Sequence, residues 1–314
     1  MKTSSETEMP GSAVIFEYSQ TGQLTETVDA LVAPLRAAGW QVRRVRIELA
    51  APYPFPWPIT RFFGVFPACT DERAVADLAP PSAEMYSSPG ELVILAYQVW
   101  YLAPSLPARA LLLRHREIFA GRDVLTVVAC RNMWYSAVAE TNRHLAVAGA
   151  RGVGTITTID TRAQFLTLVT TLRWLLLGRR DGALFGRAGV GGDELARVGA
   201  LGIDIARTKS RDEIAAALRA ADSAPVVPML AAADMLAGKE FRRWGAVIRQ
   251  ASRFGAAARV TTLTGFVGSL GLAIAVGFPI LAAAELLGGS RFDRIVRTRL
   301  AASLRMPVPA GAAS

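Results

Sequence analysis

The stretch AVIFEYSQTGQLTETVDALVAPLRAAG, residues 13–39, reads as a buried strand, a short polar loop and a helix. Residues 13–18 form a short apolar run, as expected of a strand that is covered on both faces. Apolar residues then recur at helical spacing, and Gly39 is a residue type that commonly ends a helix. The apolar helical positions are Leu24, Val28, Leu31, Val32 and Leu35. This order predicts the first unit of a parallel sheet covered by helices.

The same alternation of strand and helix continues through residue 178. Strand-like runs are expected at 41–49, 92–99, 123–129 and 152–159, with helices at 107–119, 136–148 and 162–177. Five strands with intervening helices predict an α/β fold, a doubly wound five-stranded parallel sheet over residues 1–178. We expect a helical appendage at 179–240 and a basic, hydrophobic C-terminal segment at 241–314.

The loop between the first strand and the first helix has the composition of a phosphate site. It runs through Ser19, Gln20, Thr21, Gly22, Gln23 and Leu24. Hydroxyl groups and successive backbone N–H groups at a helix N-terminus can surround one phosphate group. The loop lacks a Walker lysine and a dinucleotide glycine fingerprint, which favours a monophosphate. The alternative is that Ser19 and Thr21 merely cap the helix.

This loop resembles the FMN phosphate loop of the flavodoxin-like family, whose pattern is roughly S/T-x-T-G-x-T. Ser19, Thr21 and Gly22 match that pattern, and Leu24 stands where the pattern has a hydroxyl residue. The resemblance implies a flavodoxin-like fold with FMN as the cofactor. It also implies that the flavin ring meets the loops after the third and fourth strands.

Two aromatic segments occupy those ring-binding positions. The first comprises Gln98, Val99, Trp100, Tyr101 and Leu102, and the second comprises Arg131, Asn132, Met133, Trp134 and Tyr135. Flat aromatic side chains can stack on a flavin while backbone N–H groups bind its polar edge. We therefore expect both segments to contact FMN, although a Trp-Tyr pair is also common in a protein core.

A second resemblance extends along nearly the whole chain, to bacterial proteins labelled dialkylresorcinol condensing enzymes. It is carried by YSQTGQL (18–24), YPFPWP (53–58), RFFGVFP (61–67), WYLAPSLP (100–107) and RWLLLGRRD (173–181). The resemblance implies a role in making dialkylresorcinol or aryl polyene lipids, with a ketosynthase and an acyl carrier protein as partners. A homodimer is a further expectation from the flavodoxin-like reductases.

Carbon–carbon condensation needs a nucleophilic Cys with His or Asn partners. The chain has two histidines, His115 and His144, among polar helix neighbours, and two cysteines, Cys69 and Cys130. The sequence therefore favours an FMN-dependent oxidoreductase that aromatises a cyclic diketone over a condensing enzyme, and it predicts no metal site.

The catalytic residues cannot be assigned from the sequence. Glu17, Tyr101 and Tyr135 are nominal candidates for the base. The proline-aromatic insertion at 53–66 is a lid for apolar substrates or a surface loop whose rings dock on the core. Two other functions remain open: a membrane-tethered NAD(P)H-quinone or electron-transfer flavoprotein, and a non-catalytic scaffold on a flavin-free flavodoxin fold.

The C-terminal segment is apolar and basic. Residues 260–284 contain no charged residue, and residues 239–314 carry 11 basic and 3 acidic side chains, most of the chain's net charge of +9. An uncharged apolar run between basic flanks is typical of a membrane anchor, and a buried helical hairpin is the alternative. Because the basic excess flanks an apolar run, we do not expect nucleic-acid binding. The polar N-terminus predicts no secretory signal, hence a cytoplasmic domain that is membrane-associated.

Overall fold

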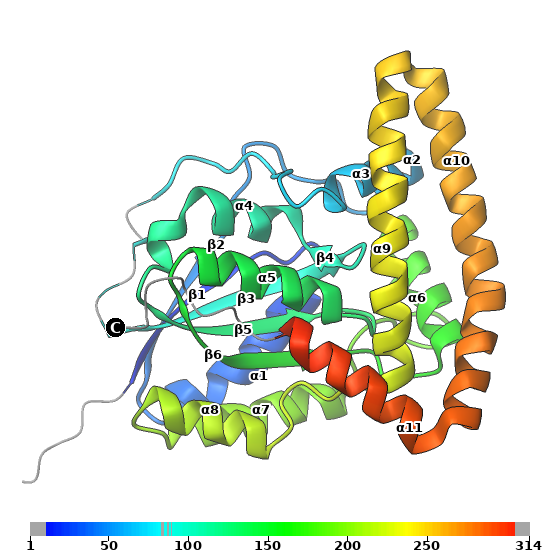
Figure 1. The fold of residues 1–314 in the computed structure, drawn as a ribbon. Helices are drawn as coiled ribbons and strands as arrows, with labels where there is room; N and C mark the ends of the chain where they lie inside the picture. Colours follow the sequence, from blue (N-terminus) through cyan, green and yellow to red (C-terminus); the bar gives the residue numbers. More distant parts are fainter. Residues whose placement is uncertain (1–10, 83–84, 87, 89, 305–314) are drawn as a thin grey trace, which may run out of the picture.

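The computed structural model describes residues 11–82, 85–86, 88 and 90–304. Residues 1–10 of the polar N-terminus and the basic residue Arg305 lie outside these ranges. The five expected strands form one parallel sheet in the order β2-β1-β3-β5-β6, which confirms the α/β class (Figure 1). The strands are β1 (Ser12–Glu17), β2 (Gln41–Arg46), β3 (Leu92–Trp100), β5 (Asp123–Ala129) and β6 (Arg151–Thr158). This order is that of the flavodoxin-like fold, in which the connections change direction between β1 and β3.

One face of the sheet is covered by α1 (Gln23–Ala37), α7 (Gly192–Ala206) and α8 (Arg211–Ala220). The apolar stripe of α1 packs on alternate side chains of β1, β3 and β5, and Val198, Leu201 and Ile205 of α7 join the same cluster. Gly202 lets the two helices approach closely, because a Cβ there would lie 2.5 Å from the Leu31 carbonyl oxygen. α7 and α8 therefore share one core with the sheet, and the domain boundary expected after residue 178 stays a prediction.

The opposite face is covered by α4 (Leu106–Arg114), α5 (Tyr135–Val147), α9 (Pro228–Ala251) and the end of α11 (Phe278–Leu304). The helix expected at 107–119 is shorter than predicted and is followed by a 3₁₀ turn at Arg116–Ile118. α9 runs through residue 240, where the sequence predicts a boundary.

α6 (Gln164–Leu177) contributes no residue to the two hydrophobic clusters that cover the faces of the sheet. Its polar side chains contact the loop after β5 at the carboxyl edge of the sheet, while Phe165 and Leu177 are exposed. This placement leaves α7 to cover the sheet.

The insertion between β2 and β3 is only partly extended. Residues 52–58 are non-helical, but α2 (Ile59–Gly64) and α3 (Phe66–Cys69) follow, so the extended path expected from the alternating prolines ends at Pro58. Phe66 stacks on Phe266 with ring centroids 3.8 Å apart, which joins the insertion to the C-terminal helices. Phe66 thus docks on the C-terminal helices, whereas Phe55 is 39% exposed, and the choice between a lid and a surface loop stays a prediction.

The C-terminal helices form a hairpin that projects beyond the sheet. α10 (Ala256–Leu272) runs antiparallel to α9, and a π-helical stretch (Ala273–Gly277) leads into α11, which crosses back toward α5 (Figure 1). One side of α10 packs on α9 through Phe266, whereas Val260 and Leu272 on its other side are more than half exposed. The expected apolar segment is therefore packed on the body along one side only.

Candidate functional site

The β1–α1 loop presents an uncapped helix N-terminus at the carboxyl edge of the sheet. Gly22 precedes α1 with φ at 83°, in the left-handed region that favours glycine, and no side chain caps the helix. A Cβ built on Gly22 would meet no atom within 4 Å, so the space beside it is open. The interpretation that Ser19 and Thr21 merely cap the helix is thus not supported, and the N-terminal N–H groups remain available to an anion.

Gln98 at the end of β3 holds this loop. Its side-chain oxygen accepts a hydrogen bond from the Gln20 backbone N–H at 2.9 Å, and its amide nitrogen donates to the Thr21 hydroxyl at 3.2 Å. The Gln20 side chain donates to the carbonyl oxygens of Tyr53 and Pro54 at 3.1 and 3.0 Å. The β1–α1 loop and the first aromatic segment therefore lie in contact, and the insertion between β2 and β3 contacts the same loop.

Ser19 is the residue of the β1–α1 loop whose hydroxyl has no hydrogen-bond partner. Its Oγ is buried. A buried hydroxyl without a partner is costly, and such a group often marks a missing ligand or water. Its position in the loop is consistent with a donor to a phosphate oxygen.

Gln23 and Leu24 face the protein rather than the loop. The Gln23 side chain accepts a hydrogen bond from the Val190 backbone N–H at 3.3 Å, and Leu24 is fully buried among the side chains beneath α1. Gly189 lies so close to Gln23 that a larger residue there would collide with it. The glycine-rich turn 189–192 thus supports the loop from behind, a role that its sequence did not reveal.

The first aromatic segment, residues 98–102, ends in a tight hairpin. Tyr101 and Leu102 have φ of 50° and 64°, and the turn pairs β3 with the short antiparallel strand β4 (Ala103–Pro104). Such values are strained for non-glycine residues and are frequent near functional sites. Val99 pairs with Pro104 and is half-buried.

Trp100 lies in an aromatic cluster with the insertion and the first loop. The ring centroids of Tyr18, Tyr53 and Trp57 lie 5.9, 5.1 and 5.5 Å from that of Trp100, all edge-on. The Tyr18 hydroxyl donates to the Gln20 side-chain oxygen. The cluster therefore stands directly beside the phosphate-type loop.

The second aromatic segment, residues 131–135, splits between the sheet edge and the core. Arg131 donates to the Thr167 hydroxyl at 3.3 Å, its pKa is lowered by burial, and Asn132 donates to Gln164, so both contact α6. Met133 is half-buried. Trp134 and Tyr135 are each only 1% exposed and pack under α9, so neither ring is open to a ligand at the sheet edge. The stacking role expected of these two rings does not fit this burial.

A residue far along the chain explains that burial. Asp234 of α9 accepts hydrogen bonds from the backbone N–H groups of Tyr135 and Ser136 at 3.1 and 3.0 Å and so satisfies the N-terminus of α5. Asp234 is fully buried, and burial raises the pKa of its carboxyl to about 7. α9 is thus fixed over the segment that the sequence assigned to the ring.

The nominal catalytic bases are all engaged. Glu17 accepts a hydrogen bond from Arg44 at 2.7 Å, which explains how a carboxylate is tolerated in β1. The Tyr101 hydroxyl donates to the Phe62 carbonyl at 2.8 Å, and burial raises its pKa. The Tyr135 hydroxyl interacts with the backbone of Val227, and burial raises its pKa to about 12. Glu17 is buried and ion-paired, and the two tyrosine hydroxyls stay protonated near neutral pH, so none of the three is placed to act as a base.

The cysteines and histidines show no catalytic arrangement. Cys69 and Cys130 are buried, and burial raises both thiol pKa values to about 12. The Nδ1 atom of His115 lies 3.1 Å from a carboxylate oxygen of Glu117, two residues further along the chain. The Nε2 atom of His144 lies 3.6 Å from a carboxylate oxygen of Glu140, one turn earlier on the same helix. Within the described ranges, no group of three or more His, Cys, Asp or Glu residues is placed to hold a metal ion.

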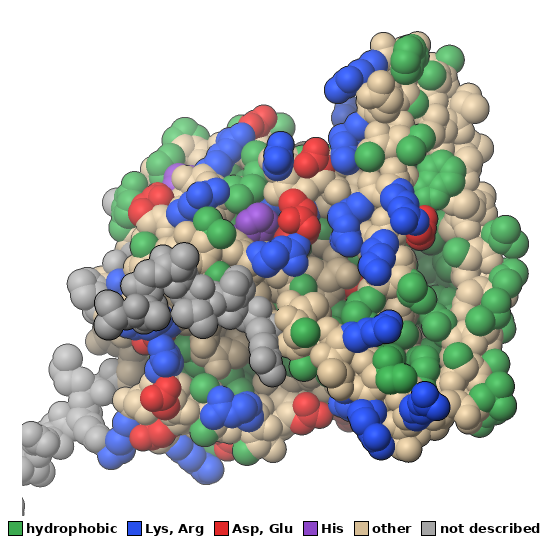
Figure 2. Space-filling view, in the orientation of Figure 1, with side chains coloured by type: hydrophobic (Ala, Val, Ile, Leu, Met, Phe, Trp, Pro, Cys, Tyr) green, Lys and Arg blue, Asp and Glu red, His purple; other side chains and the backbone are tan. Residues whose placement is uncertain are grey.

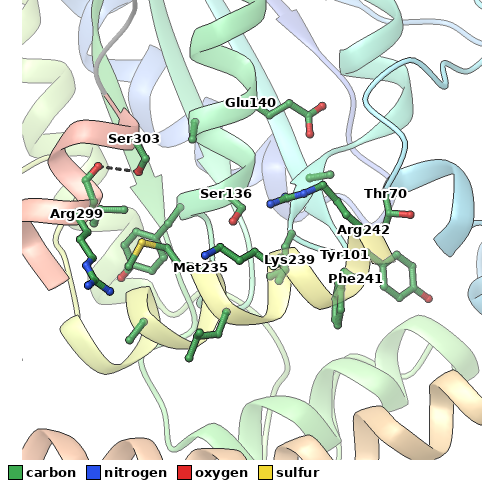
Figure 3. Close-up of a pocket in the computed structure, with 18 of the residues that line it drawn as sticks. Thr70, Tyr101, Ser136, Glu140, Met235, Lys239, Phe241, Arg242, Arg299 and Ser303 are labelled. Atoms are coloured by element: carbon green, nitrogen blue, oxygen red, sulfur yellow. Dashed lines mark hydrogen bonds between the residues drawn. The ribbon is translucent and has the colours of Figure 1, made fainter. Parts of the chain in front are cut away.

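A cavity of about 830 Å³ lies away from the phosphate-type loop, between α5, α9 and α11. Tyr101, Leu102 and Tyr135 are the predicted site residues that line it. Figure 3 shows Tyr101 at the cavity. The phosphate-type loop and this cavity are therefore two separate features, connected through the turn after β3.

Comparisons with known proteins give a weak structural likeness and no family. No protein-family model and no curated protein matches the chain, so the resemblance to dialkylresorcinol condensing enzymes gains no support. A flavoprotein in complex with FMN from Lactobacillus acidophilus NCFM is 10% identical with a TM-score of 0.37, over 47% of this chain and 93% of that one. Putative flavoproteins from Bacteroides uniformis ATCC 8492 and Bacteroides eggerthii DSM 20697 are 14% and 13% identical, with TM-scores of 0.35 and 0.36. Each covers 53% of this chain, and the matches span 97% and 98% of those proteins. At these scores the likeness assigns no cofactor, and the flavodoxin-like fold rests on the strand order.

Proposed function

We propose that the chain binds FMN with its phosphate on the β1–α1 loop and acts as an oxidoreductase at a membrane surface. The observation that carries the proposal is the partnerless buried hydroxyl of Ser19 beside an uncapped helix N-terminus, at the point where the strand order changes direction. The phosphate end of FMN fits this arrangement. Ser19, Thr21 and the first N–H groups of α1 would hold it.

The ring end of FMN would lie near Trp100, beside the insertion. Bound FMN would supply a two-electron acceptor or donor for an organic substrate. The chain's own residues orient the ligand: Gln98 fixes the loop, and the rings of Tyr53 and Trp57 limit the access of water to Trp100. Trp134 and Tyr135 take no part in this proposal.

The finer proposal is that the substrate is an apolar cyclic diketone that loses two hydrogens to become a resorcinol, in dialkylresorcinol or aryl polyene lipid synthesis. Its support is the resemblance of the quoted sequence segments and the apolar surface beside the site. A ketosynthase and an acyl carrier protein would then act before this chain, and a homodimer stays part of the proposal. An electron-transfer or quinone-reducing role would use the same loop.

Membrane association is supported by the C-terminal helices. The helical stretch Ala256–Leu304, which is kinked at Gly289, contains an 18-residue window of mean hydropathy 2.1 with no buried residue, and it is long and apolar enough to cross a membrane. Because α10 is packed on α9 along one side, we propose that this stretch lies in the plane of the interface. Flotation with phospholipid vesicles tests this; replacing exposed Leu272 and Ile280 by Asp should abolish flotation, and unchanged flotation would contradict it.

A flavin-free scaffold is the second candidate. It is favoured by the hydrogen bonds that hold the Gln20 side chain against the insertion and by the burial of Trp134 and Tyr135 in the second aromatic segment. The two candidates differ in one property, the affinity of the purified protein for FMN.

Ser19→Ala separates them by two opposite effects. In the protein alone, removing an unsatisfied buried hydroxyl should leave the stability unchanged or raise it by about 1 kcal/mol. FMN affinity, measured by quenching of flavin fluorescence, should fall by at least about tenfold, because a hydrogen bond to a charged group is lost.

Thr25→Val is the matched control for this titration. Thr25 lies in the same helical turn, but it lines a different polar cavity with Arg44 and Asp29, so the substitution should leave FMN affinity unchanged. Equal FMN affinities of wild type and Ser19→Ala would reject the loop as the phosphate site.

A further inference from the structure

The cavity between α5, α9 and α11 has a mainly apolar wall and a cationic rim. Its volume is about 830 Å³, within the range of roughly 300–1,000 Å³ that small-molecule sites occupy. Its apolar wall is formed by Met235, Leu236, Phe241, Leu281, Phe292 and Ile295. No feature of the proposed FMN loop lines it.

More basic than acidic side chains line the cavity. The two carboxylates that line the cavity are already paired, Glu140 with Arg109 at 2.6 Å and Glu72 with Arg143 at 2.7 Å. Lys239, Arg242 and Arg299 also line it, and they form none of the ion pairs recorded within the described part of the chain. The cavity therefore has positive charge available to a ligand.

Two of these cations act from one face of α9. Lys239 and Arg242 are three residues apart, so they lie on the same side of the helix. Figure 3 shows both side chains extending from α9 into the space in front of α5, near Ser136. The positive charge of Arg242 also favours the ionised form of the buried Asp234 carboxyl. A head group bound there would meet two cations and the Ser136 hydroxyl.

The apolar wall adjoins the exposed apolar surface of the C-terminal helices, and Figure 2 shows hydrophobic side chains gathered along the α10 side of the molecule. Leu281 belongs to the uncharged run 260–284 and also lines the cavity. Ile280, its neighbour, is 61% exposed. A molecule dissolved in a membrane could thus enter the groove along this surface without its chain crossing water.

We infer that this cavity binds a single-chain amphiphile with an anionic head group, a carboxylate or phosphate monoester, held at Lys239 and Arg242 with its alkyl chain along α11. Charge complementarity selects the head group, and the apolar wall selects the chain. The inference does not depend on FMN, because no residue of the β1–α1 loop takes part. A loss of FMN binding would leave it unaffected.

Calorimetric titration of the full chain in mild detergent tests the inference. The probes are dodecyl phosphate below its micelle-forming concentration, dodecanol and inorganic phosphate. Dodecyl phosphate should bind saturably with one molecule per chain. Dodecanol should bind at least about tenfold more weakly, and inorganic phosphate should not bind measurably.

Variants locate the site. The double variant Lys239→Met, Arg242→Met should weaken dodecyl phosphate binding by about tenfold or more. Arg243→Met is the matched control: Arg243 lies on the same helix, is 74% exposed, pairs with Glu240 and does not line the cavity, so its loss should change nothing.

Ile295→Glu on α11 gives an independent reading if the double variant unfolds, since Ile295 is 45% exposed and its replacement should not disturb the core. It should also weaken binding. Equal binding of dodecyl phosphate and dodecanol, equal effects of the double variant and Arg243→Met, or unchanged binding by Ile295→Glu would overturn the inference.

Discussion

Replacing Arg109 by methionine should destabilise the protein by about 3–5 kcal/mol, since it leaves a buried carboxylate without its partner. Arg109 is fully buried on α4, and its guanidinium donates to both oxygens of Glu140 at 2.6 and 3.2 Å. Glu140 is only 5% exposed, so water and the neighbouring His144, 3.6 Å away, would replace the lost partner poorly. The guanidinium also donates to the carbonyl oxygens of Ala68, Cys69, Asp71 and Ala74, at 2.7 to 3.2 Å.

The assay is urea unfolding at neutral pH, with the slope of the transition compared between variants. Arg114→Met is the control on the same helix: Arg114 is 46% exposed and pairs with a largely exposed Asp77, so its loss should lower the unfolding free energy by less than about 1 kcal/mol.

A double variant isolates the unpaired carboxylate. Arg109→Met with Glu140→Met should recover more than half of the loss, because two apolar side chains replace the ion pair. A loss for Arg109→Met no greater than that for Arg114→Met would refute the reasoning.

Three further predictions concern buried groups. The Asp234 carboxyl titrates at about 7 in the folded protein and near 4 when unfolded, so the folded state binds more protons between these values. Stability should therefore fall by on the order of 1.4 kcal/mol per unit as pH rises from about 4 to 7 and level off above, and Asp234→Asn, followed by urea unfolding across pH, should flatten that slope. Cys69 and Cys130, with pKa values raised to about 12, should resist alkylation by iodoacetamide at pH 8 until urea is added, and rapid labelling of the folded protein would contradict their burial. Gly202→Val should lower the urea midpoint by separating α7 from α1, since its side chain would collide with the Leu31 carbonyl; an unchanged midpoint would refute this close packing.

The sheet could be predicted from the sequence because its signals are local. Each parallel strand is a short apolar run, and α1 carries a regular apolar stripe that ends before Gly39. The five strands and α1 therefore follow from periodicity and helix-ending residues, whereas the end of α4 and the placement of α6 away from the sheet do not. The β1–α1 loop was equally visible, since Ser19, Thr21 and Gly22 are neighbours in the chain.

The remainder of the site depends on contacts between distant residues. Asp234 caps α5 from 99 residues away, and nothing near Trp134 in the sequence indicates that α9 will cover it. A Trp-Tyr pair has the same pattern whether it is buried or stacks on a ligand. The left-handed turn at Tyr101 also lacks the Gly or Asn that usually marks such a turn.

The cavity is a product of the same long-range packing. Lys239 and Arg242 appear in the sequence as part of a general basic flank, indistinguishable from exposed Arg243. Only the placement of α9 against α5 and α11 separates cations that line a groove from one that faces water.

The central claim is that the β1–α1 loop holds the phosphate of FMN. The most direct test is the visible absorption spectrum of the protein purified in detergent and supplied with FMN, with riboflavin as the ligand that lacks the phosphate. The account predicts one tightly held FMN per chain, released on denaturation, and much weaker retention of riboflavin. A protein that holds neither, or that holds riboflavin as well as FMN, would contradict it.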